Sequence, residues 1–150
     1  MTRLDYRYEE CGLDNVILVG LETCEDDEGA AVVTIRHINV LHRAIVQAIA
    51  TKQSGITGRE IRFVRTELGL TQAELAGYLG KDAQTVARWE KGKTPVDQTA
   101  DTVIRMLALE HADGVRPSVK EMASWSVASS AEPPIMIDAS DQENWRPLAA

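Results

Sequence analysis

A short stretch from Ala83 to Arg88 carries side chains that can recognise the edges of DNA bases. Gln84 can form two hydrogen bonds with adenine, Arg88 can donate to N7 and O6 of guanine, and the methyl group of Ala83 can contact thymine. At helical spacing, Val86 and Trp89 share the other, core-facing side. The pattern predicts a helix that buries its apolar side and presents base-reading groups to a major groove.

Basic residues gather around this stretch, although the whole chain is acidic. The net charge is −7, and residues 1–56 carry five Lys/Arg against nine Asp/Glu, residues 57–110 eight against eight, and residues 111–150 three against six. Between positions 81 and 93 the balance turns positive, with Lys81, Arg88, Lys91 and Lys93 against Asp82 and Glu90. A phosphate-facing edge needs such a local excess of positive charge.

The elements that would position these groups are four short helices with clear start signals. Thr57 with Glu60 and Thr71 with Glu74 have the spacing of capping boxes, which predicts helices over 58–68 and 72–79. Asp82 can cap a third helix that Gly92 terminates, and Asp97 can cap a fourth. The expected core residues are Ile61, Val64, Leu68, Leu75, Ala76, Leu79, Val86, Trp89, Ala100, Val103, Ile104 and Leu107.

The second and third of these helices have the residues that a steep helix crossing needs. Ala76 provides a small side chain where the backbones meet, and Gly80 tolerates left-handed geometry in the turn. The stretch from 70 to 92 resembles the lambda-repressor-like helix-turn-helix family, also called the Xre or Cro/C1 family. The residues that match its pattern are Leu70, Thr71, Gln72, Leu75, Ala76, Leu79, Gly80, Thr85, Val86, Trp89, Glu90 and Gly92.

The resemblance implies roles for individual residues. In that family the start of the second helix and a Thr near the start of the third contact phosphate, while exposed positions of the third helix read bases. Base reading is thereby assigned to Ala83, Gln84 and Arg88. Phosphate contact is assigned to Gln72, Thr85, Lys91 and Lys93, together with Lys81, which stands where the family usually has an aliphatic residue.

Residues 1–56 predict a small β-meander followed by one helix. Short β-like runs over 6–8, 16–19 and 31–35 are separated by glycines and by the acidic stretch 25–28. From Ile38 to Lys52 the apolar residues follow helical spacing instead. The apolar residues of this helix cover a broad face, which suits packing on its own domain and packing on a second subunit equally well.

A narrower resemblance links this N-terminal part to MqsA-type antitoxins and their YgiT-like relatives, through 6–8, 12–16, 41–42 and 57–62. In those proteins a zinc ribbon with two Cys-x-x-Cys pairs precedes the helix-turn-helix. Here Cys11 and Cys24 are separated by 12 residues, whereas zinc-ligand pairs usually have about two to four between them. We therefore expect a degenerate zinc ribbon without a metal, and two reduced thiols.

The last part of the chain, residues 113–150, is rich in Pro, Ser and Ala, which predicts an extended or partly disordered tail. A strand over 135–137 and packing of Trp125 and Trp145 onto the body are alternatives that the sequence leaves open. The expected fold is α+β in three parts: 1–56 as a β unit with a helix, suited to a dimer or partner interface, 57–112 as the helix-turn-helix domain, and the tail.

Other functional classes find little support in the chain. It has no apolar run of the roughly 20 residues that span a bilayer and no apolar leader, so we expect a cytoplasmic protein without membrane contact. Paired carboxylates, a nucleophile with its base and a phosphate-binding loop are all missing, so we expect no enzyme and no cofactor.

The sequence thus predicts a homodimeric regulator that binds an inverted-repeat operator on double-stranded DNA and represses transcription, including that of its own gene. The alternative is an antitoxin that neutralises a basic toxin and uses DNA binding for autoregulation. The acidic flanks favour a basic partner of this kind.

Overall fold

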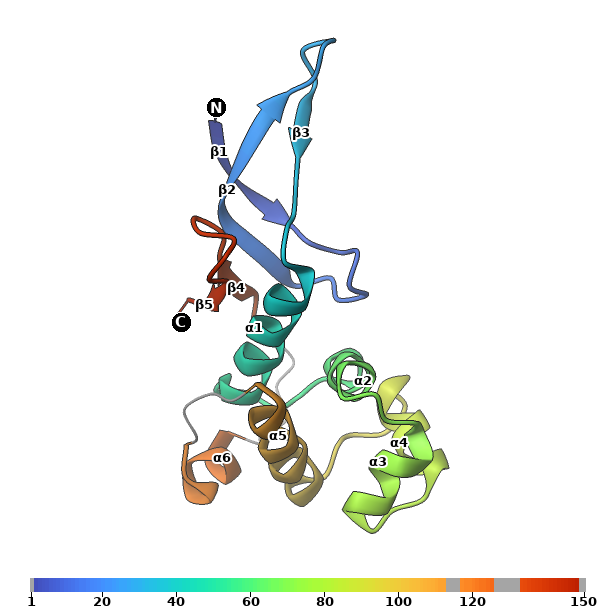
Figure 1. The fold of residues 1–150 in the computed structure, drawn as a ribbon. Coiled ribbons are helices and arrows are strands. Elements are labelled where there is room, and N and C mark those ends of the chain that lie inside the picture. The colour runs from blue at the N-terminus through green and yellow to red at the C-terminus, as the bar shows by residue number, and fades with distance from the viewer. Residues whose placement is uncertain (1, 113–116, 126–132, 149–150) are drawn as a thin grey trace. The chain divides into compact units, whose positions relative to one another are not determined.

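The computed structural model describes residues 2–112, 117–125 and 133–148 (Figure 1). The chain divides into two compact units. The first, here called the sheet unit, comprises Met1–Ile45 and Pro133–Ala150, and the second, the helical unit, comprises Val46–Glu132. The α+β fold with N-terminal strands followed by helices is as the sequence predicts.

The sheet unit is built on one long central strand. Strand β2 (Val16–Glu25) pairs antiparallel with β1 (Thr2–Arg7) and with β3 (Ala31–Val33). It also pairs in parallel with β4 (Ile135–Asp138), which in turn pairs antiparallel with β5 (Arg146–Pro147). The order is β1-β2-β4-β5, with β3 beside the second half of β2. The three N-terminal strands overlap the runs expected over 6–8, 16–19 and 31–35, but β1 begins four residues earlier, β2 extends six residues further and β3 ends two residues earlier.

The alternation of apolar residues explains why β2 lies at the centre. Val16, Leu18 and Leu21 are completely buried, and Ile135 and Ile137 of β4 are buried beside them in the same sheet. The change of face between Leu18 and Leu21 coincides with Gly20, whose φ of +75° is in the left-handed region that favours glycine. Beside it, the register of β1 shifts between Leu4 and Tyr6, as a β-bulge does.

Helix α1 (Ile38–Thr51) follows the sheet, within a residue of the range expected from its periodicity. Leu41, Ala44 and Ile45 are buried in the part that belongs to the sheet unit, where His42 Nε2 and the hydroxyl of the buried Tyr8 share a hydrogen bond of 2.8 Å. The second half of the helix, from Val46, belongs to the helical unit. The boundary between the units therefore lies within α1, whereas the sequence placed it at residue 56.

The helical unit contains α2 (Gly58–Glu67), α3 (Gln72–Leu79), α4 (Ala83–Glu90), α5 (Gln98–Ala112) and α6 (Val119–Trp125). Both capping boxes are present, with reciprocal bonds between Thr57 and Glu60 and between Thr71 and Glu74. The Asp82 carboxylate caps α4, and the Asp97 carboxylate accepts the backbone N–H of Ala100 at the start of α5. All four predicted starts are thus occupied by their capping side chains.

A buried ion pair joins α5 to the segment between α1 and α2. Arg105 is completely buried and pairs with Asp101 at 2.6 Å. Its guanidinium also donates to the carbonyls of Ala50 and Lys52 at 3.2 and 2.6 Å, and to that of Ser54. The Asp101 carboxylate accepts the backbone N–H of Ile56 at 2.9 Å. The end of α1 and the segment after it are therefore fixed to the helical unit by hydrogen bonds to α5.

The expected tail is divided between the two units. Residues 119–125 form α6, in which Met122 is buried, and the Gln98 side chain donates to the carbonyl of Ala123 at 2.8 Å. Residues 133–148 add β4 and β5 to the sheet, and Trp145 is buried there with its indole N–H donating to the carbonyl of Arg36 at 2.8 Å. The strand over 135–137 is therefore present. The described residues after 116 thus form a helix and two strands and not an extended tail. Composition does not predict the pairing of β4 with β2, because the two strands are far apart in the sequence.

Candidate nucleic-acid interface

The turn between α3 and α4 has the tight geometry that the sequence predicts. Gly80 ends α3 with φ +65° and ψ +30°, and its N–H donates to the carbonyl of Ala76. The N–H of Lys81 donates to the same carbonyl at 2.9 Å. Asp82 follows in extended geometry and caps α4. Three residues, Gly80, Lys81 and Asp82, thus connect the two helices, which contact each other directly (Figure 1).

Helix α4 is anchored from beneath by its apolar side. Val86 is completely buried and Trp89 is 3% exposed. Leu75 and Ala76 of α3 are each 1% exposed and complete this contact, since α3 and α4 pack together. Leu79, expected in the same core, is half-buried. Burial of Val86 and Trp89 fixes which side of α4 remains available to a partner.

The remaining side of α4 carries the predicted base-reading groups. Gln84 and Arg88, one helical turn apart, are exposed, and Ala83 is half-exposed at the first position of the helix. Thr85, predicted to contact phosphate, is half-exposed, and its hydroxyl donates to the Asp82 carboxylate at 2.9 Å. The structure therefore brings Gln84 and Arg88 together on an exposed surface, while the Thr85 hydroxyl is bonded within the cap.

Hydrogen bonds at the start of α4 favour the ionised form of the Asp82 carboxylate. The backbone N–H of Thr85 donates to Asp82 at 2.8 Å, and the Thr85 hydroxyl adds a second bond. These hydrogen bonds, helped by the positive charge of Arg88, hold the pKa of Asp82 below its ordinary value. The negative charge lies at the N-terminus of α4, where the helix dipole favours it.

The three predicted phosphate-binding lysines have different surroundings. Lys91 and Lys93 are exposed and follow α4 directly, on either side of Gly92 with its φ of +71°. The N–H of Lys93 donates to the carbonyl of Arg88 at 2.9 Å, which fixes the backbone of this turn. The side chain of Lys81 lies 3.4 Å from Asp97, and both are about two-fifths exposed. Lys81 is therefore engaged by an ion pair that the sequence did not predict.

Gln72, the remaining predicted phosphate contact, belongs to a network that sequence reasoning missed. Its side-chain amide donates to Glu90 at 3.2 Å, and Arg65 forms an ion pair with the same carboxylate at 2.7 Å. Glu90 was recognised only as part of the family pattern. The one local signal for this pair is that Arg65 directly follows the buried Val64, at the border of the apolar face of α2.

Gly58 is a second residue whose role was missed. A Cβ at this position would lie 2.0 Å from the carbonyl oxygen of Trp89 and 3.0 Å from its carbonyl carbon. The first turn of α2 therefore packs directly on the backbone at the end of α4. Only a glycine allows so close an approach. A glycine directly after the N-cap Thr57, inside the capping box, is the only trace of this contact in the sequence.

Comparison with known families bears on this surface. Residues 61–118 match the family model described as helix-turn-helix. This part of the chain is therefore similar to a helix-turn-helix domain. It contains the whole of α3 and α4 and every residue predicted above to contact bases or phosphates. The domain supports a role in DNA binding and regulation of transcription. Comparisons with curated proteins and with solved structures gave no match.

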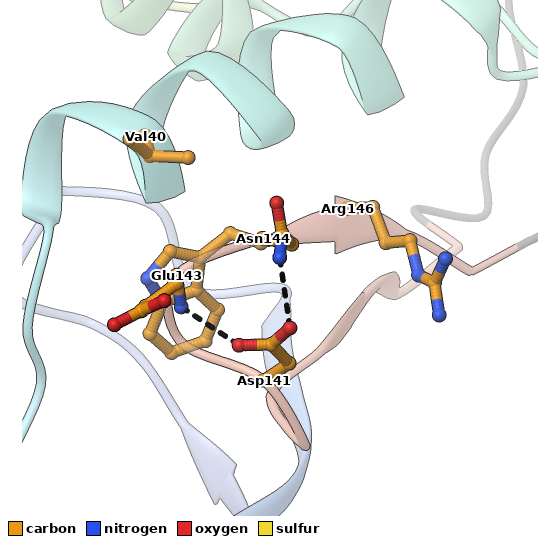
Figure 2. Close-up of a pocket in the computed structure, with 6 residues that line it drawn as sticks. Val40, Asp141, Glu143, Asn144 and Arg146 are labelled. Carbon is orange, nitrogen blue, oxygen red and sulfur yellow. Dashed lines mark hydrogen bonds between the residues drawn. The ribbon is translucent and has the colours of Figure 1, made fainter.

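Outside the helix-turn-helix domain, the sheet unit has a hollow of about 430 Å³ beside the loop between β4 and β5. Its lining residues, drawn in Figure 2, are Val40, Asp141, Glu143, Asn144, Trp145 and Arg146. The Asp141 carboxylate accepts the side-chain amide of Asn144 at 2.9 Å and the backbone N–H of Glu143 at 3.1 Å. These bonds hold the pKa of Asp141 below its ordinary value, so the carboxylate stabilises the loop itself.

Within the described residues, no group of His, Cys, Asp and Glu is placed to hold a metal ion. No helix in the described ranges has the length and apolarity that crossing a bilayer requires.

Proposed function

We propose that the protein is a repressor of transcription that binds an inverted-repeat operator as a homodimer. The observation that carries the proposal is the exposed side of α4, where Gln84 and Arg88 lie one turn apart above the buried Val86 and Trp89. In this proposal α4 enters the major groove, Arg88 binds guanine, and Gln84 binds adenine. Ala83 contacts a thymine methyl group at the start of the helix.

Phosphate contacts would hold α4 in the groove. Lys91 and Lys93 continue from its C-terminal end, and Gln72 and Thr85 lie at the starts of α3 and α4. Lys81 joins them if it leaves Asp97. These contacts are independent of base sequence and make the affinity depend on salt.

The proposed dimer is argued from the small size of the exposed side of α4, here called the reading surface. A single module of this kind buries roughly 600–1,000 Å² and makes few base contacts, which gives modest affinity. Two linked modules on half-sites about 34–36 Å apart gain affinity because the second binding step is intramolecular. A bound dimer over a promoter, including its own, would exclude RNA polymerase.

The experiment selects bound sequences from a random duplex library and then compares variants on the selected operator. Arg88→Ala should weaken operator binding by about 1–3 kcal/mol and relax specificity at one position. Lys93→Ala should weaken binding to all duplexes alike and flatten the salt dependence. Lys120→Ala, an exposed lysine outside residues 61–118, is the charge-matched control and should bind as the parent does. Full affinity and selectivity of Arg88→Ala would refute its assignment.

A second candidate function is that of an antitoxin. Exposed acidic residues lie at the end of β2 and in the loop that follows it, and they favour a basic partner: Glu25, Asp26, Asp27 and Glu28. The experiment is co-expression with small basic proteins encoded beside the gene. A stable complex would support this function. DNA binding without any such complex would refute the antitoxin function and leave only the proposed repressor function.

A further inference from the structure

Glu90, the last residue of α4, connects three helices through one carboxylate. Its Oε2 accepts Nε of Arg65 at 2.7 Å, and its Oε1 accepts Nη2 of the same guanidinium at 3.0 Å. Oε1 also accepts Nε2 of Gln72 at 3.2 Å. Arg65 lies in the last turn of α2, and Gln72 is the first residue of α3. Helix α4 is thereby hydrogen-bonded to both α2 and α3.

This carboxylate is paired with a guanidinium in a nearly closed environment. The side chain of Glu90 is 5% exposed and that of Arg65 is 15% exposed. A buried carboxylate is costly unless it is paired, and the two parallel bonds from a guanidinium are a strong form of pairing. The same interaction raises the pKa of Arg65. Arg65 also donates to the carbonyl of Leu70 at 3.0 Å, which fixes the turn before α3.

The effect on Gln72 is to fix the orientation of a half-buried amide. Its Nε2 carries two hydrogens, and one of them is given to Glu90. Among the described residues the structure records no other hydrogen bond of this side chain. This hydrogen bond restricts the rotamers of Gln72 before the side chain meets a partner. Such preorganisation lowers the entropic cost of binding.

We propose that Glu90 is a positioning residue for DNA binding, whose carboxylate, neutralised by Arg65, fixes the Gln72 amide so that its second hydrogen is donated to a backbone phosphate. The partner is a phosphate oxygen of duplex DNA, an acceptor that an amide hydrogen matches. Arg65 is needed because an uncompensated carboxylate near a phosphate would repel it. The inference rests on the proposed DNA binding.

The first test removes the amide without touching the ion pair. Gln72→Met keeps the length of the side chain and leaves Glu90 paired with Arg65. Binding is measured by fluorescence anisotropy with a labelled duplex of mixed sequence at low salt, and with the selected operator. We expect a loss of about tenfold on both duplexes, the effect of one hydrogen bond to a charged group. Gln53→Met, at an exposed glutamine before α2, is the matched control and should bind as the parent does.

The second test separates positioning from simple stabilisation. Glu90→Gln removes the charge and is introduced both into the parent and into Gln72→Met, with unfolding curves to select a temperature at which each variant is folded. We expect Glu90→Gln to weaken DNA binding in the parent and to have little further effect in the Gln72→Met background. Equal losses in the two backgrounds would show that Glu90 acts on the fold alone and would overturn the proposal.

A third measurement needs no variant at residue 90, in case Glu90→Gln fails to fold. The two side-chain amide protons of Gln72 give separate resonances in a ¹⁵N-labelled sample. Addition of the duplex should shift the proton that does not bind Glu90, and absence of any shift would overturn the proposal. If the parent protein binds no duplex at all, the proposed function fails. If the parent binds and Gln72→Met binds equally well, only the role of Glu90 and Gln72 is refuted.

Discussion

Replacement of Gly58 by alanine should strongly destabilise the helical unit. The new Cβ would lie 2.0 Å from the carbonyl oxygen of Trp89, whereas real Cβ contacts essentially never fall below 3.0 Å. The neighbours are backbone atoms at the end of α4, so α2 and α4 must separate by roughly 1 Å in a close-packed interior. Overpacking of this kind costs about 1–3 kcal/mol or more. The higher helix propensity of alanine than of glycine offsets less than about 1 kcal/mol of this loss in stability.

The net effect on the free energy of unfolding should therefore be a loss of roughly 2 kcal/mol. Gly77→Ala is the matched control, because Gly77 is exposed in the middle of α3 and a Cβ there has nothing within 4 Å. That substitution should stabilise the protein by about 0.5–1 kcal/mol. The same substitution of glycine by alanine should thus lower the free energy of unfolding at Gly58 and raise it at Gly77.

Urea unfolding followed by far-ultraviolet circular dichroism measures both changes, through the midpoint and the slope of the transition. DNA affinity is measured in parallel, because displacement of the end of α4 should also disturb the reading surface. Unchanged stability of Gly58→Ala would refute the close contact between α2 and Trp89. A loss for Gly77→Ala would show that α3 does not have the exposed face described here.

Three further changes test other contacts. Asp82→Asn keeps a capping oxygen but cannot titrate. Because folding lowers the pKa of Asp82, the charge of this residue stabilises the fold above about pH 4, and this stabilisation is lost as the pH falls through the lowered pKa. The free energy of unfolding of the variant should therefore depend less on pH in the acid range. Arg105→Met removes the ion pair with Asp101 and the guanidinium's hydrogen bonds to three carbonyls, and should cost about 3–5 kcal/mol in urea unfolding. Lys81→Ala should flatten the salt dependence of DNA binding less than Lys93→Ala, since Lys81 must first leave Asp97.

The sequence predicts the helices of the DNA-binding part well because their signals are local. A capping box needs only a hydroxyl and a glutamate three residues later, and Thr57 and Thr71 both have them. The left-handed turn needs only a glycine, which Gly80 provides. The exposed positions of Gln84 and Arg88 then follow from the helical period once Val86 and Trp89 are assigned to the core.

Contacts between residues far apart in the sequence leave no such signal. The parallel pairing of β4 with β2 joins Ile135 to Val16, and the intervening residues contain the whole helical unit. Composition alone therefore indicated a tail where the chain returns to the sheet. The ion pair between Arg65 and Glu90 and the close approach at Gly58 are missed for the same reason, since each joins elements through a partner that local patterns do not identify.

The structure also divides the predicted DNA contacts into two groups by what they already bind. Thr85, Lys81 and Gln72 each have a carboxylate partner within the protein, in Asp82, Asp97 and Glu90. A phosphate must compete with the carboxylate for the Thr85 hydroxyl and for Lys81, so the net contribution of these two groups to affinity is the difference between two interactions, whereas Gln72 keeps a second amide hydrogen for the phosphate. Arg88, Lys91 and Lys93 are exposed and bring positive charge to the DNA without that cost. The free energy of binding should therefore come mainly from the exposed residues at the end of α4, while the three bonded side chains determine how the helix is oriented on the backbone.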